Sequence, residues 1–326
     1  MDAQSGKEPD VTASLSGTET FFIVMNASSG NRDAQVTKDT ISAVLTQGNR
    51  RFELMAVDYG SQLTSTARRA VQLAREQGGV VVAAGGDGTL NAVAQVVLDT
   101  GLPFGILPQG TFNYFGRAYG ISQDTETAAR CLLDAVIKPV QVGLLNNRPF
   151  LVNASFGLYP QLLEDREAYK QRYGRSRWVA LWSAIVTLMH AHRQLHVQLE
   201  FGGKTRTLRT PTMVVDNNAL QLKHMGLDEE QELERHHLVA ITSKPVGTLA
   251  QYGILIRGLL SHLGQADNVI SFGFDRMTVR LGRKKHTKVA LDGELSELDT
   301  PLEFKVAPHR LQLLVPRKTT GTGSPG

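Results

Sequence analysis

A short apolar run that ends on closely spaced glycines constrains the fold of this chain more than any other feature. Residues 80–84 are continuously apolar, and they are followed by Gly85-Gly86-Asp87-Gly88-Thr89-Leu90-Asn91. An apolar run of this length is typical of a buried strand. After Thr89, a suitable N-cap residue, apolar residues recur at the spacing of one helix face, at positions 90, 93, 94, 97 and 98. The pattern predicts a strand that passes through a glycine loop into a helix.

This loop has the chemistry of a phosphate-binding site. Glycine lacks a Cβ atom, so the backbone N–H groups of Gly85, Gly86 and Gly88 can approach an anion closely. The N-terminus of the following helix adds unsatisfied N–H groups and the positive end of a dipole. Asp87 would repel phosphates unless a cation or a transferable proton stood between them, so we expect Mg²⁺ near Asp87, held through the phosphates. The alternative is a strand-turn-helix corner in which the glycines serve geometry alone. The spacing matches neither a P-loop nor a dinucleotide fingerprint.

The first part of the chain alternates predicted strands with predicted helices. The strands cover residues 21–25, 51–57, 80–84 and 104–107, and the helices cover residues 39–45, 63–75, 89–98 and 125–135. Strands joined by single helices pair in parallel, which predicts a three-layer α/β domain. Loops rich in Gly, Ser, Thr and Asn follow three of the strands, at residues 26–31, 85–91 and 108–113. Because ligands bind beyond the carboxyl ends of parallel strands, we expect these loops to converge on one site.

After about residue 140 the pattern changes to short β-rich runs separated by turn signals. The runs cover residues 142–145, 148–154, 195–201, 205–209, 212–215, 238–242, 269–274, 277–281, 287–291 and 302–306. This pattern predicts a mostly antiparallel β-sandwich or barrel as a second domain. Helical patterns at residues 178–190 and 249–263 interrupt it. These two helices either pack against the sheet or help to form a lipid-accepting groove.

Length and composition favour two folded domains. A chain of 326 residues exceeds the size at which one core usually stops growing. We expect a disordered tail over residues 1–18, an α/β domain over 19–139, a β-rich domain over 140–299 and a second disordered tail over 318–326. Residues 300–317 are expected to return to the first domain.

Charge, cysteine content and hydropathy exclude several classes of protein. The net charge of +4 fits an anionic membrane surface or phosphorylated ligands as well as an ordinary surface. Cys131 is the only cysteine, so no intrachain disulfide can form, and its helical apolar pattern indicates core packing. No apolar run reaches the length of a membrane span, and no secretory signal is present. The expected location is the cytoplasm.

Five separated motifs, in order along the chain, carry a family resemblance. They are Asn26-Ala27-Ser28-Ser29-Gly30, Gly85–Thr89, Leu107–Asn113, Asn153–Gly157 and Leu291-Asp292-Gly293-Glu294. With them the chain resembles bacterial members of the diacylglycerol kinase catalytic family, which are related to sphingosine kinases, over residues 21–316. The resemblance implies a nucleotide domain like those of NAD kinases and phosphofructokinases, a β-rich substrate domain and an active site in the cleft.

The resemblance also implies roles for particular residues. It makes Gly85 to Asn91 the main triphosphate-binding loop for ATP, with further nucleotide contacts from Asn26, Ser28, Ser29, Thr111, Asn113 and either Ser61 or Thr64. It places Asp292 and Glu294 in the general-base motif, with Glu294 as the first choice for the base and Asp292 as the second. A lipid hydroxyl needs a carboxylate to take its proton as it attacks the γ-phosphorus, while loop amides and Mg²⁺ stabilise the transferring charge. Without the other motifs, Asp292-Gly293 would be interpreted as a plain β-turn.

The sequence also departs from the family pattern. Tyr114 stands where many relatives have Asp. Residues 216–226 lack the Asn-Gly and glycine cluster that relatives commonly carry. Residues 233–237 leave Glu234 as the only carboxylate aligned with a family motif that holds a second, structural Mg²⁺. We therefore expect this auxiliary metal site to be absent or altered.

These observations predict a peripheral lipid kinase that transfers the γ-phosphoryl group of ATP to a hydroxyl of diacylglycerol or a related lipid, with Mg²⁺. Two alternatives remain. One is a kinase of the same nucleotide fold that acts on a soluble hydroxyl substrate such as NAD, and the other is a nucleotide- or lipid-binding protein without phosphotransfer. The expected partner is a lipid at a membrane surface. No nucleic-acid partner is expected, and a homodimer is left open.

Overall fold

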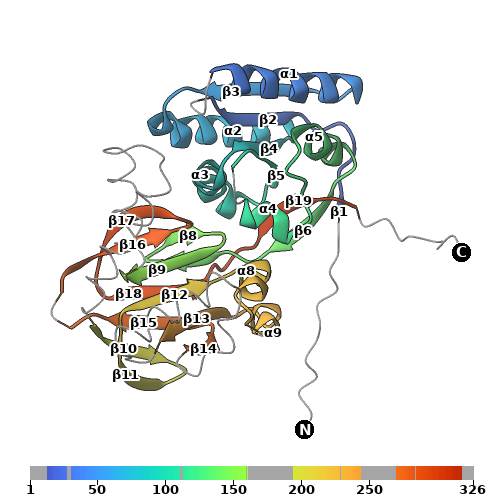
Figure 1. The fold of residues 1–326 in the computed structure, drawn as a ribbon. Helices are drawn as coiled ribbons and strands as arrows, with labels where there is room; N and C mark the ends of the chain where they lie inside the picture. The colour runs from blue at the N-terminus through green and yellow to red at the C-terminus, as the bar shows by residue number, and fades with distance from the viewer. Residues whose placement is uncertain are drawn as a thin grey trace, which may run out of the picture. The chain divides into compact units, whose positions relative to one another are not determined.

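The computed structural model describes residues 13–27, 31–110, 113–158, 160, 194–227, 229–243, 269–282 and 284–317. The chain divides into two compact units, one formed by residues 1–140 with 309–326 and the other by residues 141–308 (Figure 1). The chain therefore leaves the first unit after Val140 and returns to it at His309. The return is shorter than the expected 300–317, because residues 302–306 form a strand of the second unit.

A seven-stranded sheet forms the centre of the first unit. Its strand order is β1-β6-β19-β5-β4-β2-β3. The strands are β1 (Ala13–Ser14), β2 (Phe21–Asn26), β3 (Phe52–Val57), β4 (Val80–Gly85), β5 (Pro103–Pro108), β6 (Val136–Val140) and β19 (Leu311–Val315). Strands β3, β2, β4, β5 and β19 pair in parallel, whereas β6 runs antiparallel to β19 and β1. The predicted parallel α/β class is confirmed.

Helices cover both faces of this sheet (Figure 1). Helix α1 (Asn31–Gln47) packs with α5 (Thr125–Leu133), and α2 (Leu63–Gln77) packs with α3 (Asp87–Val97). The two pairs lie on opposite faces. Helix α1 joins β2 to β3 in one direction across the sheet, whereas α2 and α3 join strands in the opposite direction, so right-handed crossovers place them on opposite faces. Short helical turns η1 (Gly60–Gln62), η2 (Leu98–Thr100) and α4 (Tyr114–Ala118) complete the unit. The unit thus has three layers, and α1 begins eight residues earlier than the predicted 39–45.

The parallel register brings the carboxyl ends of three neighbouring strands to one edge of the sheet. Met25 on β2 lies opposite Ala84 on β4, and Gly85 lies opposite Pro108 on β5. The loops that follow β2, β4 and β5 therefore all start at this edge. Within these loops, residues 28–30 and 111–112 lie outside the described part of the chain.

The second unit is a β-sandwich, as predicted. One sheet has the order β11-β10-β15-β18-β7-β8 and the other β14-β13-β12-β9-β16-β17, and every strand pair in both is antiparallel. The strands of the first sheet are β7 (Gly143–Leu145), β8 (Arg148–Phe150), β10 (Leu195–Phe201), β11 (Lys204–Thr210), β15 (Arg276–Arg280) and β18 (Leu302–Val306). Those of the second are β9 (Asn153–Gly157), β12 (Thr212–Asp216), β13 (Leu238–Ser243), β14 (Val269–Phe274), β16 (His286–Leu291) and β17 (Glu294–Asp299).

The core of the sandwich contains apolar residues of both sheets, including Val197, Val279 and Phe304 from one and Phe156 and Val215 from the other. A smaller apolar cluster lies on the opposite face of the second sheet. There helices α8 (Ala219–His224) and α9 (Glu230–Glu234) supply Leu222 and Leu233, which pack with residues of β13. The predicted helices at residues 178–190 and 249–263 lie outside the described residues.

Residues 13–18, which were expected to belong to a disordered tail, have partners in the fold. Strand β1 pairs with residues 136–137 of β6, and Arg51 Nη2 donates a hydrogen bond to the carbonyl oxygen of Thr18 at 2.7 Å. Since these backbone groups have partners, regular structure begins before residue 19. Among the described helices, none combines the length and apolarity that crossing a membrane requires.

Candidate functional site

The glycine loop joins β4 directly to the first turn of α3. The helix begins at Asp87, and Gly86 is its N-cap with extended backbone (φ −77°, ψ 177°). Thr89 is therefore inside the first turn, not at the N-cap as the sequence suggested. Its hydroxyl accepts a hydrogen bond from Asn26 Nδ2 at 3.2 Å, which ties the end of β2 to the start of α3.

Two glycines are required by packing within this edge of the sheet. A Cβ atom on Gly85 would lie 2.6 Å from Cβ of Thr89, and one on Gly110 would lie 2.7 Å from Oδ1 of Asn113. Gly86 differs, because its added Cβ would meet only the Cα atom of Gly110, at 3.7 Å. Local packing thus explains Gly85 and Gly110, while it leaves Gly86 without a structural requirement.

Asp87 bridges the loop after β4 and the loop after β5. Its Oδ2 accepts the backbone N–H of Asn113 at 3.2 Å, and its buried Oδ1 has no hydrogen-bond partner among the described residues. Burial raises the pKa of Asp87, and the Asn113 hydrogen bond opposes that shift. A half-buried acid with one buried oxygen that lacks a partner fits the expectation that a cation or a proton belongs beside it.

Asn113 closes the loop after β5. It has a left-handed backbone (φ 46°), and its side chain accepts from the N–H of Gly110 at 3.0 Å and donates to the Gly110 carbonyl at 2.7 Å. Asn113 is fully buried, so it holds the loop from within. Tyr114 follows as the first residue of α4, and the Arg117 guanidinium lies 5.8 Å from its ring centroid.

The other residues predicted to contact the nucleotide differ in their burial, and some of them are not described. Asn91 is half-buried on α3, whereas the Leu90 side chain lies in the core and its N–H bonds to the Gly86 carbonyl. Ser61 is exposed on η1, after β3. Ser28, Ser29 and Thr111 lie outside the described residues.

Gln109 also belongs to this edge, although it was not among the predicted site residues. Its N–H donates to the Gly85 carbonyl at 2.9 Å, and its side-chain oxygen accepts from Thr37 Oγ1 of α1 at 3.2 Å. The only sequence signal was its position between Pro108 and Gly110 in the third loop.

The Asp-Gly-Glu motif forms the hairpin between β16 and β17 in the second unit. Leu291 pairs with Glu294, and both Asp292 (φ 48°) and Gly293 (φ 88°) have positive φ, as in a type I′ two-residue turn. The two carboxylates differ sharply in environment. Asp292 accepts three backbone N–H groups, whereas Glu294 is exposed and makes no recorded hydrogen bond or ion pair with the described residues.

A second carboxylate lies near Asp292. Asp216 ends β12, pairs with Asn153 of β9 and has no exposed surface. One of its oxygens accepts the N–H of Asn218 at 2.6 Å, and the other has no partner among the described residues. Burial, reinforced by the charge of Asp292, holds the pKa of Asp216 well above its usual range. No sequence pattern had marked Asp216 as a functional residue.

No cluster of three or more metal-ligating side chains occurs within the described residues. In the segment expected to carry an altered metal site, His237 Nδ1 lies 2.7 Å from a carboxylate oxygen of Glu232, which therefore has a local partner. Glu234, the last residue of α9, belongs to the same short helix as Glu232.

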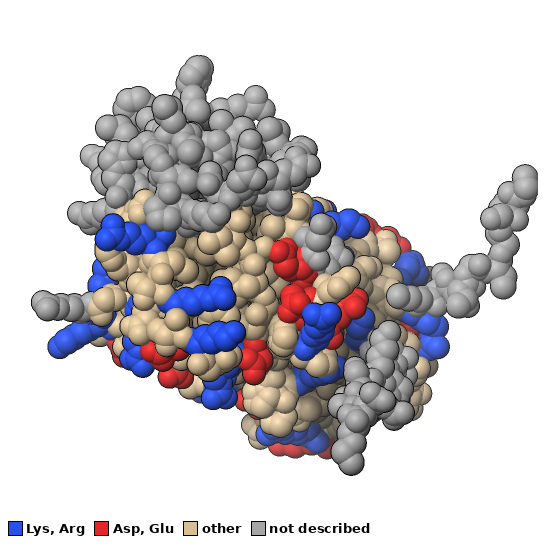
Figure 2. Space-filling model, turned by 90° about the horizontal axis from the view of Figure 1, so that it is seen from below, with Lys and Arg blue, Asp and Glu red and all other residues tan. Residues whose placement is uncertain are grey.

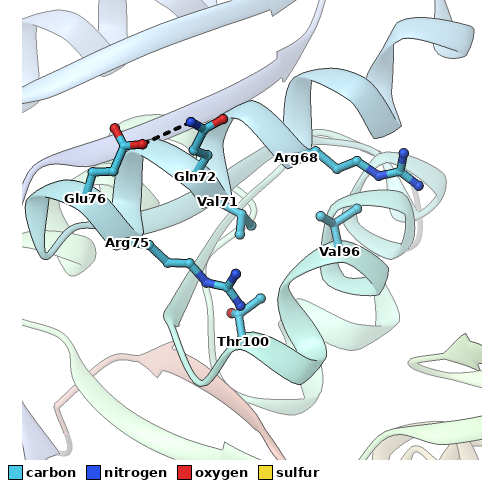
Figure 3. Close-up of a pocket in the computed structure, with 7 residues that line it drawn as sticks. All are labelled: Arg68, Val71, Gln72, Arg75, Glu76, Val96 and Thr100. Carbon is cyan, nitrogen blue, oxygen red and sulfur yellow. Dashed lines mark hydrogen bonds between the residues drawn. The ribbon is translucent and has the colours of Figure 1, made fainter.

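A groove of about 520 Å³ lies along α2, and its lining contains none of the predicted site residues (Figure 3). It is lined by Arg68, Val71, Gln72, Arg75, Glu76, Val96 and Thr100. Arg75 reaches from α2 toward Thr100, and Gln72 donates a hydrogen bond to Glu76 at 3.0 Å (Figure 3). The groove is open and carries both signs of charge, so it does not compete with the loop edge as a nucleotide site.

Comparisons with known proteins agree with the motifs. Residues 20–145 match the family model of the diacylglycerol kinase catalytic domain. An uncharacterized protein of Synechocystis is 24% identical over 316 residues, which is 93% of this chain and 71% of that protein. Diacylglycerol kinase of Bacillus subtilis is 29% identical over 190 residues, 56% of this chain and 59% of that enzyme.

A solved structure shares the fold of both units. The crystal structure of a diacylglycerol kinase from Bacillus anthracis superposes with a TM-score of 0.64, at 15% identity, over 91% of this chain and 96% of the other. At this identity the likeness concerns the fold alone.

Proposed function

Since a diacylglycerol kinase catalytic domain spans residues 20–145, we propose that this protein is a lipid kinase that transfers the γ-phosphoryl group of ATP to a hydroxyl of diacylglycerol or a related lipid. The observation that carries the proposal is the edge where β2, β4 and β5 end. There the glycine loop, the start of α3 and Asn113 surround the half-buried Asp87. These residues lie within the segment that matches the family model, residues 20–145.

The main chain of the loop supplies the phosphate site. The N–H groups of the first turn of α3 have no intrahelical partner, and they stand at the positive end of the helix dipole. Gly86 has no side chain to block an approaching phosphate, although packing would allow one. The triphosphate of ATP therefore binds across residues 85–89, with Asn26 positioned beside them through its bond to Thr89.

Magnesium fits the chemistry of Asp87. The buried Oδ1, which has no partner among the described residues, and the raised pKa of this half-buried acid are consistent with a group that gains from a nearby cation. When bound, Mg²⁺ would neutralise charge on the β- and γ-phosphates. Asp87 would hold the ion through those phosphates, while Asn113 N–H keeps the carboxylate oriented.

Glu294 is the general base in this proposal. It takes the proton from the lipid hydroxyl as the hydroxyl oxygen forms a bond to the γ-phosphorus. The bond from that phosphorus to the β–γ bridging oxygen breaks, and ADP leaves with the electron pair. The exposed carboxylate of Glu294 is open to a substrate, whereas three amides already occupy Asp292.

The lipid substrate brings the protein to a membrane surface as a peripheral enzyme. On the face seen in Figure 2, lysine and arginine side chains are spread over the described surface and are interrupted by neutral and acidic side chains. Attraction to anionic lipid on this face would therefore be modest, because exposed charges are screened beyond about 10 Å at ordinary salt.

The test is a labelled-ATP assay with the full chain. Radiolabel is expected in phosphatidic acid when diacylglycerol is supplied in mixed micelles with Mg²⁺, and it is expected to disappear when EDTA replaces the metal. A parallel reaction with NAD in the absence of micelles tests the soluble-substrate alternative. Nucleotide binding without turnover on diacylglycerol and on a total lipid extract would refute the proposed kinase activity.

A further inference from the structure

We infer that Asp292 is a positioning residue that clamps the hairpin carrying Glu294 onto the connection between β8 and β9. The assignment of Glu294 as the base rests on the proposed function, whereas the clamp itself is a property of the fold. The inference divides two neighbouring acids of one motif into different tasks. Asp292 fixes the turn, and Glu294 acts on the substrate.

The clamp consists of four hydrogen bonds. Asp292 Oδ2 accepts the N–H of Leu151 at 2.7 Å, and Oδ1 accepts the N–H groups of Val152 and Asn153 at 2.8 and 3.0 Å. The backbone N–H of Asp292 in turn donates to the Asn153 carbonyl at 2.8 Å. Both side-chain oxygens are thus engaged, so neither is directed at a substrate hydroxyl.

The β8–β9 connection needs these acceptors. Leu151 and Val152 are 2% and 5% exposed, and they lie in bends where no strand offers a ladder partner. A buried N–H group without an acceptor costs about 1–3 kcal/mol. One carboxylate satisfies three such groups in succession, which explains why an acid occupies this turn position.

The same segment is held from its carbonyl side by Asn217. Its N–H donates to the Val152 carbonyl at 2.8 Å, and its Nδ2 donates to the Leu151 carbonyl at 3.2 Å. Asn217 follows Asp216, whose β12 position lies opposite Asn153. The Asp292 turn, the β8–β9 connection and the end of β12 therefore form one fixed unit of backbone.

A second acid, Asp216, lies close to the clamp. Asp216 is buried and accepts the Asn218 N–H through one oxygen, and its other oxygen has no partner among the described residues. Burial, reinforced by the charge of Asp292, raises the pKa of Asp216 well above its usual range. Three amide dipoles directed at Asp292 favour the charge there.

The clamp determines where Glu294 begins β17. Only Gly293 separates the two acids, and Glu294 pairs with Leu291 at the start of the hairpin. A loosened Asp292 would release the turn, and the Glu294 carboxylate would then sample positions outside its working range. Glu294 itself contributes no recorded hydrogen bond to the clamp, so its replacement should leave the turn intact.

The experiment compares Asp292→Asn with Glu294→Gln, and uses Glu297→Gln as the matched control. Glu297 is an exposed acid on the same strand. The measurements are kcat and KM for ATP, the pH profile of kcat/KM, and amide hydrogen exchange of residues 148–157. Asn tolerates the left-handed backbone of position 292 and keeps one acceptor oxygen.

For Glu294→Gln we expect kcat to fall by about 10²–10⁴-fold, the usual contribution of a general base, with loss of the acid limb of the pH profile and unchanged exchange. For Asp292→Asn we expect faster exchange at residues 151–153, a lower kcat, unchanged KM for ATP and a retained acid limb. Glu297→Gln should match the parent protein in every measurement.

Two results would overturn the inference. Unchanged exchange at residues 151–153 in Asp292→Asn would show that no clamp operates, and a retained acid limb in Glu294→Gln would remove Glu294 as the base. If Asp292→Asn does not fold, the pH profile of Glu294→Gln still decides which acid is the base. If the parent protein has no kinase activity, the proposed function fails, while hydrogen exchange still decides whether the clamp exists.

Discussion

At the scale of single residues, two glycines of one loop perform separable tasks. Gly85 is packed against Thr89, so its lack of a side chain serves the fold. Among the described residues, a Cβ on Gly86 would meet only the Gly110 Cα atom, at 3.7 Å, and the backbone conformation of Gly86 is open to any residue. Packing therefore does not explain this glycine, whereas the proposed phosphate contact would. The sequence presents both as members of the same glycine cluster, and only the packing distinguishes them.

Alanine substitutions test this division. Gly85→Ala places a Cβ atom 2.6 Å from Cβ of Thr89 and should destabilise the protein by about 1–3 kcal/mol through overpacking. Gly86→Ala should leave the stability within about 0.5 kcal/mol, as for an ordinary surface change, but should weaken ATP binding at least tenfold. Urea denaturation and calorimetric titration with an ATP analogue provide the two readouts. Tight ATP binding by Gly86→Ala would mean that phosphate does not approach this residue.

Because Asp216 is buried and its pKa is raised, we expect the free energy of unfolding to depend on pH. Its folded-state pKa lies above its unfolded value, so the folded protein binds more protons and stability falls as the pH rises from about 4 toward the folded-state pKa. Asp216→Asn removes this loss, because the amide has nearly the same shape and does not ionise. Denaturant midpoints at pH 5 and pH 8 should converge for Asp216→Asn relative to the parent protein. An identical pH slope in both proteins would show that Asp216 does not titrate between the two states.

At the scale of elements, strands and helices with a local hydrophobic pattern were predicted best. Apolar runs identified β2, β4 and β5, and the 3.6-residue period identified α2 and α3. Strand β6 was not predicted, because Lys138 and Pro139 interrupt its apolar pattern. Helices α8 and α9 were not predicted either, because they are short and of mixed polarity. The predicted strand at 148–154 is two strands, β8 and β9, because residues 151–152 bend to meet Asp292. The hydrogen bond between Leu151 and Asp292 joins residues 141 positions apart, so no local sequence pattern could predict it.

The hairpin between β16 and β17 depends on the conformation of Gly293. Its φ of 88° is unfavourable for any residue with a Cβ atom, and no atom lies within 4 Å of an added Cβ. Gly293→Ala should therefore cost about 1–2 kcal/mol through the backbone alone. Gly60→Ala provides the control, because Gly60 also has open space but no positive φ. Equal unfolding free energies for the two variants would contradict the hairpin geometry.

At the scale of the whole molecule, the order of strands explains why the first unit is formed from two separate segments of the chain. The family match ends at residue 145, yet β19, at residues 311–315, lies between β5 and β6 in the first sheet. Leu311, Leu313 and Leu314 of β19 are almost fully buried. The first unit is therefore completed only by residues that follow the second unit in the sequence, and residues 20–145 do not form a complete sheet by themselves.

This arrangement predicts the behaviour of fragments. A fragment of residues 13–140 lacks β19, which pairs in parallel with β5 and antiparallel with β6. The fragment therefore exposes one unpaired edge on β5 and one on β6, with an apolar gap between them. We expect it to lack a cooperative thermal transition by near-ultraviolet circular dichroism. The same fragment joined to residues 309–317 through a flexible linker should regain that transition, since β19 can then enter the sheet. A control in which Leu313 and Leu314 of the joined segment are replaced by serine should again fail to unfold cooperatively. Cooperative unfolding of the 13–140 fragment alone would show that β19 adds an optional strand instead of completing the fold.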